Sequence, residues 1–206
     1  MVLTLTEVAG NPLVLTRRLR LRDGSEVVFR PLAHGDAGHL ARFLAGLSPE
    51  SRRLSTFDGY GLDTARELCD AIARYDKLRL VVEEAASGRI VGLLEFSLGL
   101  HPSDLARYRK AGVPLIEGTD CRFGPTLADD YQGRGVGTLL FPLVTEVARR
   151  FGRKRVILLG GVLTDNFRAL RYYEKNGFEA VGTFTGPGGA SSLDMILALG
   201  PEPGRV

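Results

Sequence analysis

A short glycine-rich segment, Gln132-Gly133-Arg134-Gly135-Val136-Gly137, constrains the fold of this chain more than any other feature. It follows an apolar stretch, residues 123–127, and opens an amphipathic one that begins at Val136. The pattern predicts a strand that turns into a helix at glycines, which leave backbone N–H groups uncovered by side chains. The first N–H groups of a helix are unpaired and its dipole is positive there, so such a turn favours a phosphate. Nucleotide or coenzyme binding is the first hypothesis.

The spacing excludes two other phosphate-binding motifs. A dinucleotide fingerprint, G-x-G-x-x-G, needs a glycine where this chain has Thr138. A P-loop needs Gly-Lys-Ser/Thr, whereas Gly137 is followed by Thr138 and Leu139. A glycine-rich helix start that binds nothing stays open as the alternative on this motif alone.

A second segment, residues 166–178, narrows the interpretation. Its sequence is Asn-Phe-Arg-Ala-Leu-Arg-Tyr-Tyr-Glu-Lys-Asn-Gly-Phe. It predicts a short helix with Asn166 at its start, Gly177 as a left-handed terminator and Phe178 opening the next strand. Asn166 and Tyr173 are seven residues apart, so two helical turns place them on one face.

The two segments together resemble the GNAT N-acetyltransferase superfamily. Residues 132–137 match its pyrophosphate loop, Gln/Arg-x-x-Gly-x-Gly/Ala, and residues 166–178 match its pattern Asn-x-x-Ala-x-x-x-Tyr-Glu-x-x-Gly-Phe. Parts of residues 23–51 also resemble the acetyltransferase domain of bacterial Pat-type protein-lysine acetyltransferases. The resemblance implies an α/β fold with a GNAT-type mixed, mostly antiparallel central sheet flanked by helices on both faces.

The order of the expected elements agrees with one such domain. We expect a leader that is loosely ordered (residues 1–16), a single acetyltransferase domain (17–200) and a C-terminal tail (201–206). Within the domain we expect helices at 64–75, 103–110 and from the glycine loop to about 151, and strands at 78–83, 90–98, 119–127, 156–163, 178–184 and 192–199.

The resemblance implies an acetyl-CoA-dependent acyltransferase that moves an acetyl group to a primary amine of a protein lysine or a small molecule, by direct attack on the thioester. Tyr173 matches the family's tyrosine beside the cofactor sulfur, where a phenol with a pKa of about 10 can protonate the departing thiolate. The residues implied in cofactor binding are Leu127, Ala128 and Asn166 near the pantetheine, and Gln132, Gly133, Arg134, Gly135, Val136, Gly137 and Thr138 around the pyrophosphate.

The general base is not identified by the sequence. Arg122 occupies the position where many Pat-like domains carry a glutamate. Either water removes the amine proton or another carboxylate does, the candidates being Glu95, Glu117 and Asp120. His101 lies before Pro102 in an expected loop and has no visible partner in the sequence. This departure keeps open a second function, a catalytically weak sensor or regulatory domain that binds CoA or acetyl-CoA.

Composition limits the other classes of partner. The formal charge of +3 suits an anionic cofactor without implying nucleic acid. The basic cluster at residues 149–155 is typical of cations at a helix C-terminus, with nucleic-acid binding as a third hypothesis. The two cysteines and three histidines have no metal-ligand spacing, and no apolar segment of about 18 residues occurs.

We therefore expect no metal, nucleic-acid or membrane partner, and a cytoplasmic protein. The acceptor amine, the acyl-chain preference and the oligomeric state are not readable from the sequence, and a homodimer stays open.

Overall fold

The computed structural model describes residues 2–186 and 189–200, which form two compact units. The first unit comprises Leu3–Phe96 and Gly124–Leu139. The second comprises Ser97–Phe123 and the described residues from Leu140 on, together with Val2. Each unit is described by itself. The expected single domain, residues 17–200, stays a prediction, and the expected tail lies outside the described residues.

The first unit contains the strand order β1-β2-β3-β4-β5, with the last four residues of β5 belonging to it. Strand β2 pairs antiparallel with both β1 and β3, in a register that sets Arg17 opposite Phe29 and Pro31 opposite Leu80. Residues 78–82 and 90–94 are all buried, as in strands covered on both faces. The strands are β1 (Arg17–Arg20), β2 (Glu26–Pro31), β3 (Lys77–Glu84), β4 (Ile90–Ser97) and β5 (Asp120–Leu127).

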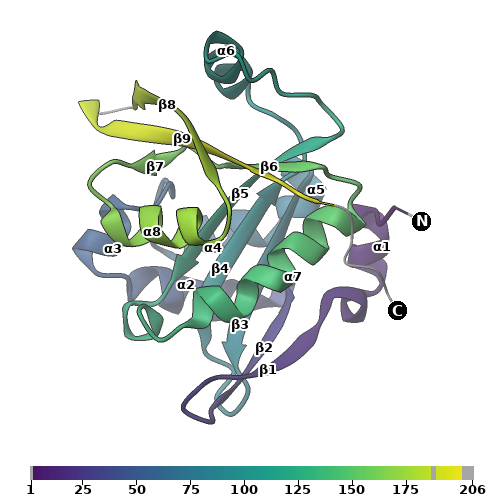
Figure 1. The fold of residues 1–206 in the computed structure, drawn as a ribbon. Helices are drawn as coiled ribbons and strands as arrows, with labels where there is room; N and C mark the ends of the chain where they lie inside the picture. The colour runs from purple at the N-terminus through teal and green to yellow at the C-terminus, as the bar shows by residue number, and fades with distance from the viewer. Residues whose placement is uncertain (1, 187–188, 201–206) are drawn as a thin grey trace. The chain divides into compact units, whose positions relative to one another are not determined.

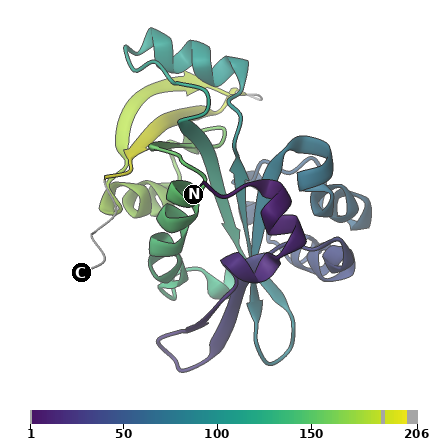
Figure 2. The same cartoon turned by 90° about the vertical axis from the view of Figure 1, so that its right-hand side faces the viewer.

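Helices cover these strands, and in Figure 2 those drawn in blue lie to one side of β3 and β4. Their apolar residues Leu40, Phe43 and Leu44 share a buried core with Val81 and Leu93 of the strands. The helical segments of this unit are α1 (Leu5–Gly10), η1 (Pro12–Leu15), η2 (His34–Asp36), α2 (Ala37–Ala45), α3 (Pro49–Arg53), α4 (Leu62–Cys69), α5 (Ala71–Tyr75) and η3 (Asp129–Tyr131).

The N-terminal segment differs from the loosely ordered leader expected for residues 1–16. It forms α1, where Thr4 and Glu7 make a capping box that satisfies N–H groups at the helix start. Leu5, Val8 and Leu15 are buried. A cap together with three buried apolar side chains explains why these residues adopt helical structure.

Two other expected elements are each divided in the structure. The helix expected at residues 64–75 is broken at Asp70 into α4 and α5. The strand expected at 156–163 is interrupted by Gly160 and Gly161, whose φ angles are +75° and +70°. Because a left-handed backbone cannot continue a strand, β6 ends before these glycines and β7 begins after them.

The second unit contains the strand order β5-β6-β9-β7, with β8 paired to β9 (Figure 1). The pair β5–β6 is parallel, and the pairs of β9 with β6, β7 and β8 are antiparallel. The elements are β6 (Arg155–Leu158), β7 (Val162–Leu163), β8 (Glu179–Thr185), β9 (Ser191–Ala198), α6 (Pro102–Lys110), α8 (Phe167–Lys175) and α7 (Val136–Arg150), whose first four residues belong to the first unit.

The strand pairs confirm the expected α/β class, a mixed and mostly antiparallel sheet flanked by helices. Pro142 lies inside α7. Within residues 2–186 and 189–200, no helix has the length and apolar character needed to cross a membrane.

Candidate functional site

The glycine loop turns the chain from η3 into α7 through two left-handed residues. Gly133 and Gly135 have φ angles of +74° and +80°, a conformation that L side chains rarely adopt. A Cβ atom on Gly133 would meet nothing within 4 Å. The glycine is therefore required there by the backbone conformation rather than by packing, and the space beside it is open at the start of a 15-residue helix.

The Gln132 side chain holds this loop to the end of β5. Its Nε2 atom donates hydrogen bonds to the Leu127 carbonyl and to Ser51 Oγ, both at 3.0 Å. The side chain is thus engaged with the protein, and the Gln132 backbone N–H also donates, to the Asp129 carbonyl at 3.2 Å. The sequence motif identified the residue but not this anchoring contact.

A second anchor lies just before the loop, at Asp129. Its carboxylate accepts hydrogen bonds from Ser48 N (2.9 Å), Ser48 Oγ (2.6 Å) and Ser51 Oγ (2.7 Å). Burial alone would raise the pKa of Asp129, but these hydrogen bonds hold it below its ordinary value. The ionised carboxylate therefore ties α3 to the base of the loop.

The Arg134 guanidinium is also committed to the protein. It lies 4.5 Å from the centre of the Tyr131 ring, donates to the Asp130 carbonyl at 3.2 Å, and forms an ion pair with Asp23. Hydrogen bonds from Ser25, together with Arg134, lower the pKa of Asp23 to about 2. A cofactor role for Arg134 would therefore use its backbone.

The last residues of β5 have one edge that is not paired with β6. The parallel register of β5 with β6 ends at Phe123 opposite Leu158, and the last four residues of β5 continue past it. The Ala128 N–H donates to Val91 O of β4 at 2.9 Å. Successive N–H groups of a strand point to opposite edges, so the Leu127 N–H points away from β4. Pro125 lies on the same edge as Leu127 and has no N–H to donate.

Asn166 and Tyr173 lie on α8, in the second unit. Asn166 Oδ1 caps the helix by accepting from the Ala169 N–H at 3.1 Å, and Gly177 ends it with a φ of +85°. The Tyr173 ring packs edge-on against Tyr172 and Phe178, with centroid distances of 5.3 and 5.1 Å. The predicted cap and terminator are confirmed.

Burial raises the pKa of Tyr173, so its phenol stays protonated near neutral pH. The residue is only 7% exposed. In the described part of the chain, the fully buried side-chain polar atoms that make no hydrogen bond belong to Asp104, Arg122 and Arg153, and those of Asp104 and Arg122 form an ion pair with each other. The Tyr173 hydroxyl is not among them, and no hydrogen bond to it is found in those residues. It can therefore donate to a ligand.

The structure thus places the predicted residues in two groups. Leu127, Ala128 and the loop from Gln132 to Thr138 are contiguous in the first unit, with two side-chain anchors. Asn166 and Tyr173 share α8 in the second unit. Among the described residues, no group of three His, Cys, Asp or Glu side chains is placed to hold a metal ion.

Two of the carboxylates considered as general bases are paired with cations. Glu95 lies 2.9 Å from Lys77 Nζ and 2.8 Å from Arg79 Nε. Asp120 is fully buried, accepts from the Ile116 N–H at 2.7 Å and is bound by Arg155. The oxygens of both carboxylates are occupied by these partners, so neither is poised as a base. Glu117 is exposed in a turn.

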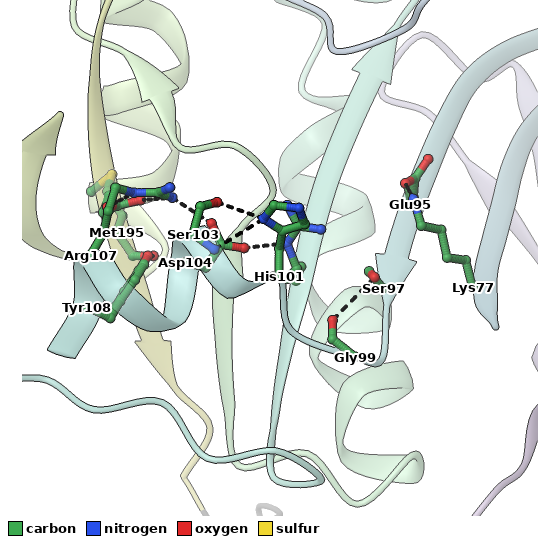
Figure 3. Close-up of polar contacts among 12 residues, drawn as sticks. Lys77, Glu95, Ser97, Gly99, His101, Ser103, Asp104, Arg107, Tyr108 and Met195 are labelled. Atoms are coloured by element: carbon green, nitrogen blue, oxygen red, sulfur yellow. Dashed lines mark hydrogen bonds and ion pairs between the residues drawn. The ribbon is translucent and has the colours of Figure 1, made fainter. Parts of the chain in front are cut away.

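The residue at the position of the family's glutamate, Arg122, is part of a buried charge network in the second unit. Its Nε lies 2.7 Å from Asp104 Oδ2, and Asp104 is 1% exposed. Asp104 also pairs with Arg107, which donates to both carboxylate oxygens of Asp194 at 2.8 and 3.0 Å (Figure 3). Sequence reasoning missed this network because positions 104, 122 and 194 are far apart in the chain.

Contacts made by Tyr108 and His101 also position α6. Tyr108, on this helix, donates to the Met195 carbonyl of β9 at 2.9 Å. His101 caps the helix through Nδ1, which accepts from the Ser103 N–H at 3.3 Å (Figure 3). The helix therefore begins at Pro102, and the His101 Nδ1 atom serves as its cap.

The basic cluster at residues 149–155 also has structural contacts. Arg149 and Arg150 lie in the last turn of α7, where cations offset the helix dipole. Arg149 donates to the Gly200 carbonyl at 3.2 Å, and Arg155 binds the buried Asp120. These contacts agree with the interpretation of the cluster as a helix end.

Comparison with known proteins supports the interpretation of both motifs. The acetyltransferase (GNAT) family matches residues 49–178, which is more than half of the chain. The acetyltransferase PA5475 of Pseudomonas aeruginosa is 29% identical over 136 residues, covering 66% of this chain and 67% of that protein.

Similar solved structures share the fold. The GNAT domain of S. lividans PAT has a TM-score of 0.68 at 21% identity, covering 91% of this chain and 99% of that one. The ribosomal-protein-S5-alanine acetyltransferase of Vibrio fischeri has a TM-score of 0.68 at 11% identity, covering 89% and 97%. AAC(6')-Ib, solved with acetyl-CoA, has a TM-score of 0.62 at 19% identity, covering 84% and 93%.

Proposed function

Because the chain belongs to the acetyltransferase (GNAT) family, we propose that it is an acetyl-CoA-dependent N-acetyltransferase that acts on a primary amine. The observation that carries this proposal is that the family match, residues 49–178, contains both the glycine loop and the α8 motif. The loop supports cofactor binding through its open backbone, and α8 supports the chemistry through a protonated tyrosine with a free hydroxyl.

In the proposed complex, backbone N–H groups of the glycine loop bind the pyrophosphate at the start of α7, while Gln132 anchors the loop through its side chain. The free edge at Leu127 and Ala128 pairs with the pantetheine through the Leu127 N–H. In the second unit, the Asn166 side chain uses its oxygen for the helix cap, so its amide nitrogen can donate to a ligand.

In the proposed reaction, the lone pair of a neutral amine attacks the thioester carbonyl carbon. A C–N bond forms, the C–S bond breaks, and the thiolate takes a proton from Tyr173 Oη. The nitrogen loses one proton to water, and Tyr173 regains one from solvent. Because the carboxylates of Glu95 and Asp120 are ion-paired, we propose proton loss through water rather than through either of them.

The acceptor is proposed only at the level of a primary amine, from a protein lysine or a small molecule. One relative of similar fold is named for acetylating an alanine of a ribosomal protein. Relatives of this fold thus do not single out one acceptor for this chain, because substrate pockets are built by loops that vary between them.

A second candidate function is favoured by one observation, the ion pair of Arg122 with the buried Asp104. A chain with a cation held at the family's glutamate position can bind CoA as a sensor without turnover. The two functions are separated by thiol release from acetyl-CoA over a panel of lysine peptides, α-amines and small amines. Turnover above the hydrolysis rate with any amine supports the enzyme. Tight CoA binding with no turnover on the whole panel supports the sensor.

A further inference from the structure

Arg22 places an unpaired cation against the glycine loop, within the first unit. It lies in the turn between β1 and β2, and its side chain is exposed. Its Nε, Cζ and Cδ atoms lie 3.6, 3.8 and 3.9 Å from the position that a Cβ atom on Gly135 would take. Within residues 2–186 and 189–200, no hydrogen bond or ion pair involves this guanidinium.

The neighbouring arginines differ from Arg22 because each has partners. Arg134 is bound by Asp23 and lies over the Tyr131 ring. Arg89 is bound by Asp130, and its guanidinium is 5.6 Å from the centre of the same ring. These two cations hold the loop, so among these three arginines only Arg22 is left for a ligand.

The turn that carries Arg22 is itself well defined. Asp23 accepts from Ser25 N at 3.0 Å and from Ser25 Oγ at 2.6 Å, and its ion pair with Arg134 joins the turn to the loop. Gly24, at a φ of +85°, donates its N–H to the Leu21 carbonyl at 3.0 Å. Leu21 is buried. The residues on both sides of Arg22 are therefore held, which places its side chain beside the loop.

The position of Arg22 is electrostatically unfavourable unless an anion lies there. Gly135 directly precedes α7, a 15-residue helix whose dipole makes its N-terminus positive. A guanidinium with no carboxylate partner adds a second positive charge at the same point. An anion that binds both the helix N–H groups and the guanidinium would remove this repulsion.

We propose that Arg22 binds a phosphate group of CoA together with the N–H groups at the start of α7. The inference rests on the proposed CoA site. CoA carries phosphate at two places, the 5′-diphosphate and the 3′-phosphate of its adenosine, and both have the charge and the oxygens that a guanidinium recognises.

The test is the dissociation constant of CoA and of 3′-dephospho-CoA, measured by calorimetry on the wild type, Arg22→Gln and Arg22→Lys. Arg42→Gln is the control, since it removes the same charge from an exposed site on α2. A lost hydrogen bond between charged groups predicts CoA binding about tenfold weaker or more in Arg22→Gln. Arg22→Lys keeps the positive charge but lacks the paired N–H donors of the guanidinium, so CoA affinity should fall less than in Arg22→Gln. Thermal unfolding of each variant without ligand checks that the fold is retained.

The outcomes separate the two phosphates and the two proposals. Equal loss with CoA and 3′-dephospho-CoA assigns Arg22 to the diphosphate, and loss with CoA alone assigns it to the 3′-phosphate. Unchanged affinity in Arg22→Gln, or an equal loss in Arg42→Gln, overturns the role of Arg22 while CoA binding stands. A wild type that binds neither compound overturns both the CoA site and the role of Arg22.

Discussion

Tyr173 has two properties that a proton donor to a thiolate needs. Its burial against Tyr172 and Phe178 raises its pKa, so it carries its proton at neutral pH. Its hydroxyl has no partner among the described residues. The motif could identify this tyrosine, whereas its burial results from contacts with side chains that the motif does not specify.

We expect Tyr173→Phe to lower kcat about 100-fold, the scale of general acid catalysis, while acetyl-CoA affinity stays unchanged. Steady-state thiol release and calorimetry measure the two quantities. Tyr172→Phe is the matched control, because it removes a phenol from the same helix and should change kcat little. An unaltered kcat in Tyr173→Phe would show that the phenol is not the donor.

Gly133 allows separate measurement of backbone strain and of ligand access. An alanine at its φ of +74° should cost about 1–2 kcal/mol of unfolding free energy. The control is Gly112, which has a φ of +79° and an equally open Cβ position. Gly112→Ala should lower the unfolding free energy by a similar amount. We expect CoA affinity to fall only for Gly133→Ala, measured by calorimetry beside chemical unfolding. Equal affinities in the two variants would contradict a phosphate site at the loop.

Strands β3 and β4 carry three charges in a mostly apolar region of the first unit. Glu95 on β4 binds Lys77 and Arg79 of β3, and Arg79 is 5% exposed and also donates to the Leu68 carbonyl. Burial alone would raise the pKa of Glu95, but Arg79 and Lys77 outweigh it and hold the pKa below its ordinary value. These ion pairs link β3, β4 and α4, and Glu95 does not serve as a base.

Glu95→Gln should therefore destabilise the fold in a pH-dependent way and leave catalysis in place. At pH 7 we expect a loss of about 3 kcal/mol, because the buried Arg79 keeps its charge without a carboxylate. The Glu95 pKa is lowered on folding, so its contribution is complete above the unfolded pKa of about 4.3 and is lost as pH falls through the folded pKa. Urea unfolding should show the difference from wild type shrinking in that acidic range.

A constant difference between wild type and Glu95→Gln from neutral to acidic pH would contradict this account of the ion pairs. A large fall in kcat for folded Glu95→Gln, with normal CoA binding, would instead restore Glu95 as the base.

At the scale of the whole molecule, ligand binding and unfolding are linked by mass action. CoA at about 100 times its dissociation constant should add about 2.7 kcal/mol of stability. For a chain of this length that corresponds to a rise in Tm of about 5–10 °C. Differential scanning calorimetry with CoA measures it, and pantetheine, which lacks the phosphates, should shift Tm much less. Equal shifts with both compounds would place the binding energy outside the glycine loop.

The local features of this protein are encoded by residues that are neighbours in the sequence. The glycine loop, the Asn166 cap and the Gly177 terminator are decided by neighbouring residues, because glycine tolerates a positive φ and a short polar side chain reaches the N–H groups beside it. The mixed, mostly antiparallel sheet followed from periodicity and family resemblance, whereas the strand order β5-β6-β9-β7 did not.

The contacts of side chains that are distant in the sequence depend on the tertiary fold. Gln132 anchors to Leu127 and Ser51, Arg122 pairs with Asp104, and Arg22 lies unpaired beside Gly135. Burial and ion pairing depend on which strands and turns are neighbours in space, which no local pattern encodes. The motif could therefore name the loop that holds a phosphate, while the cation proposed to bind that phosphate became apparent only when the β1–β2 turn was folded against it.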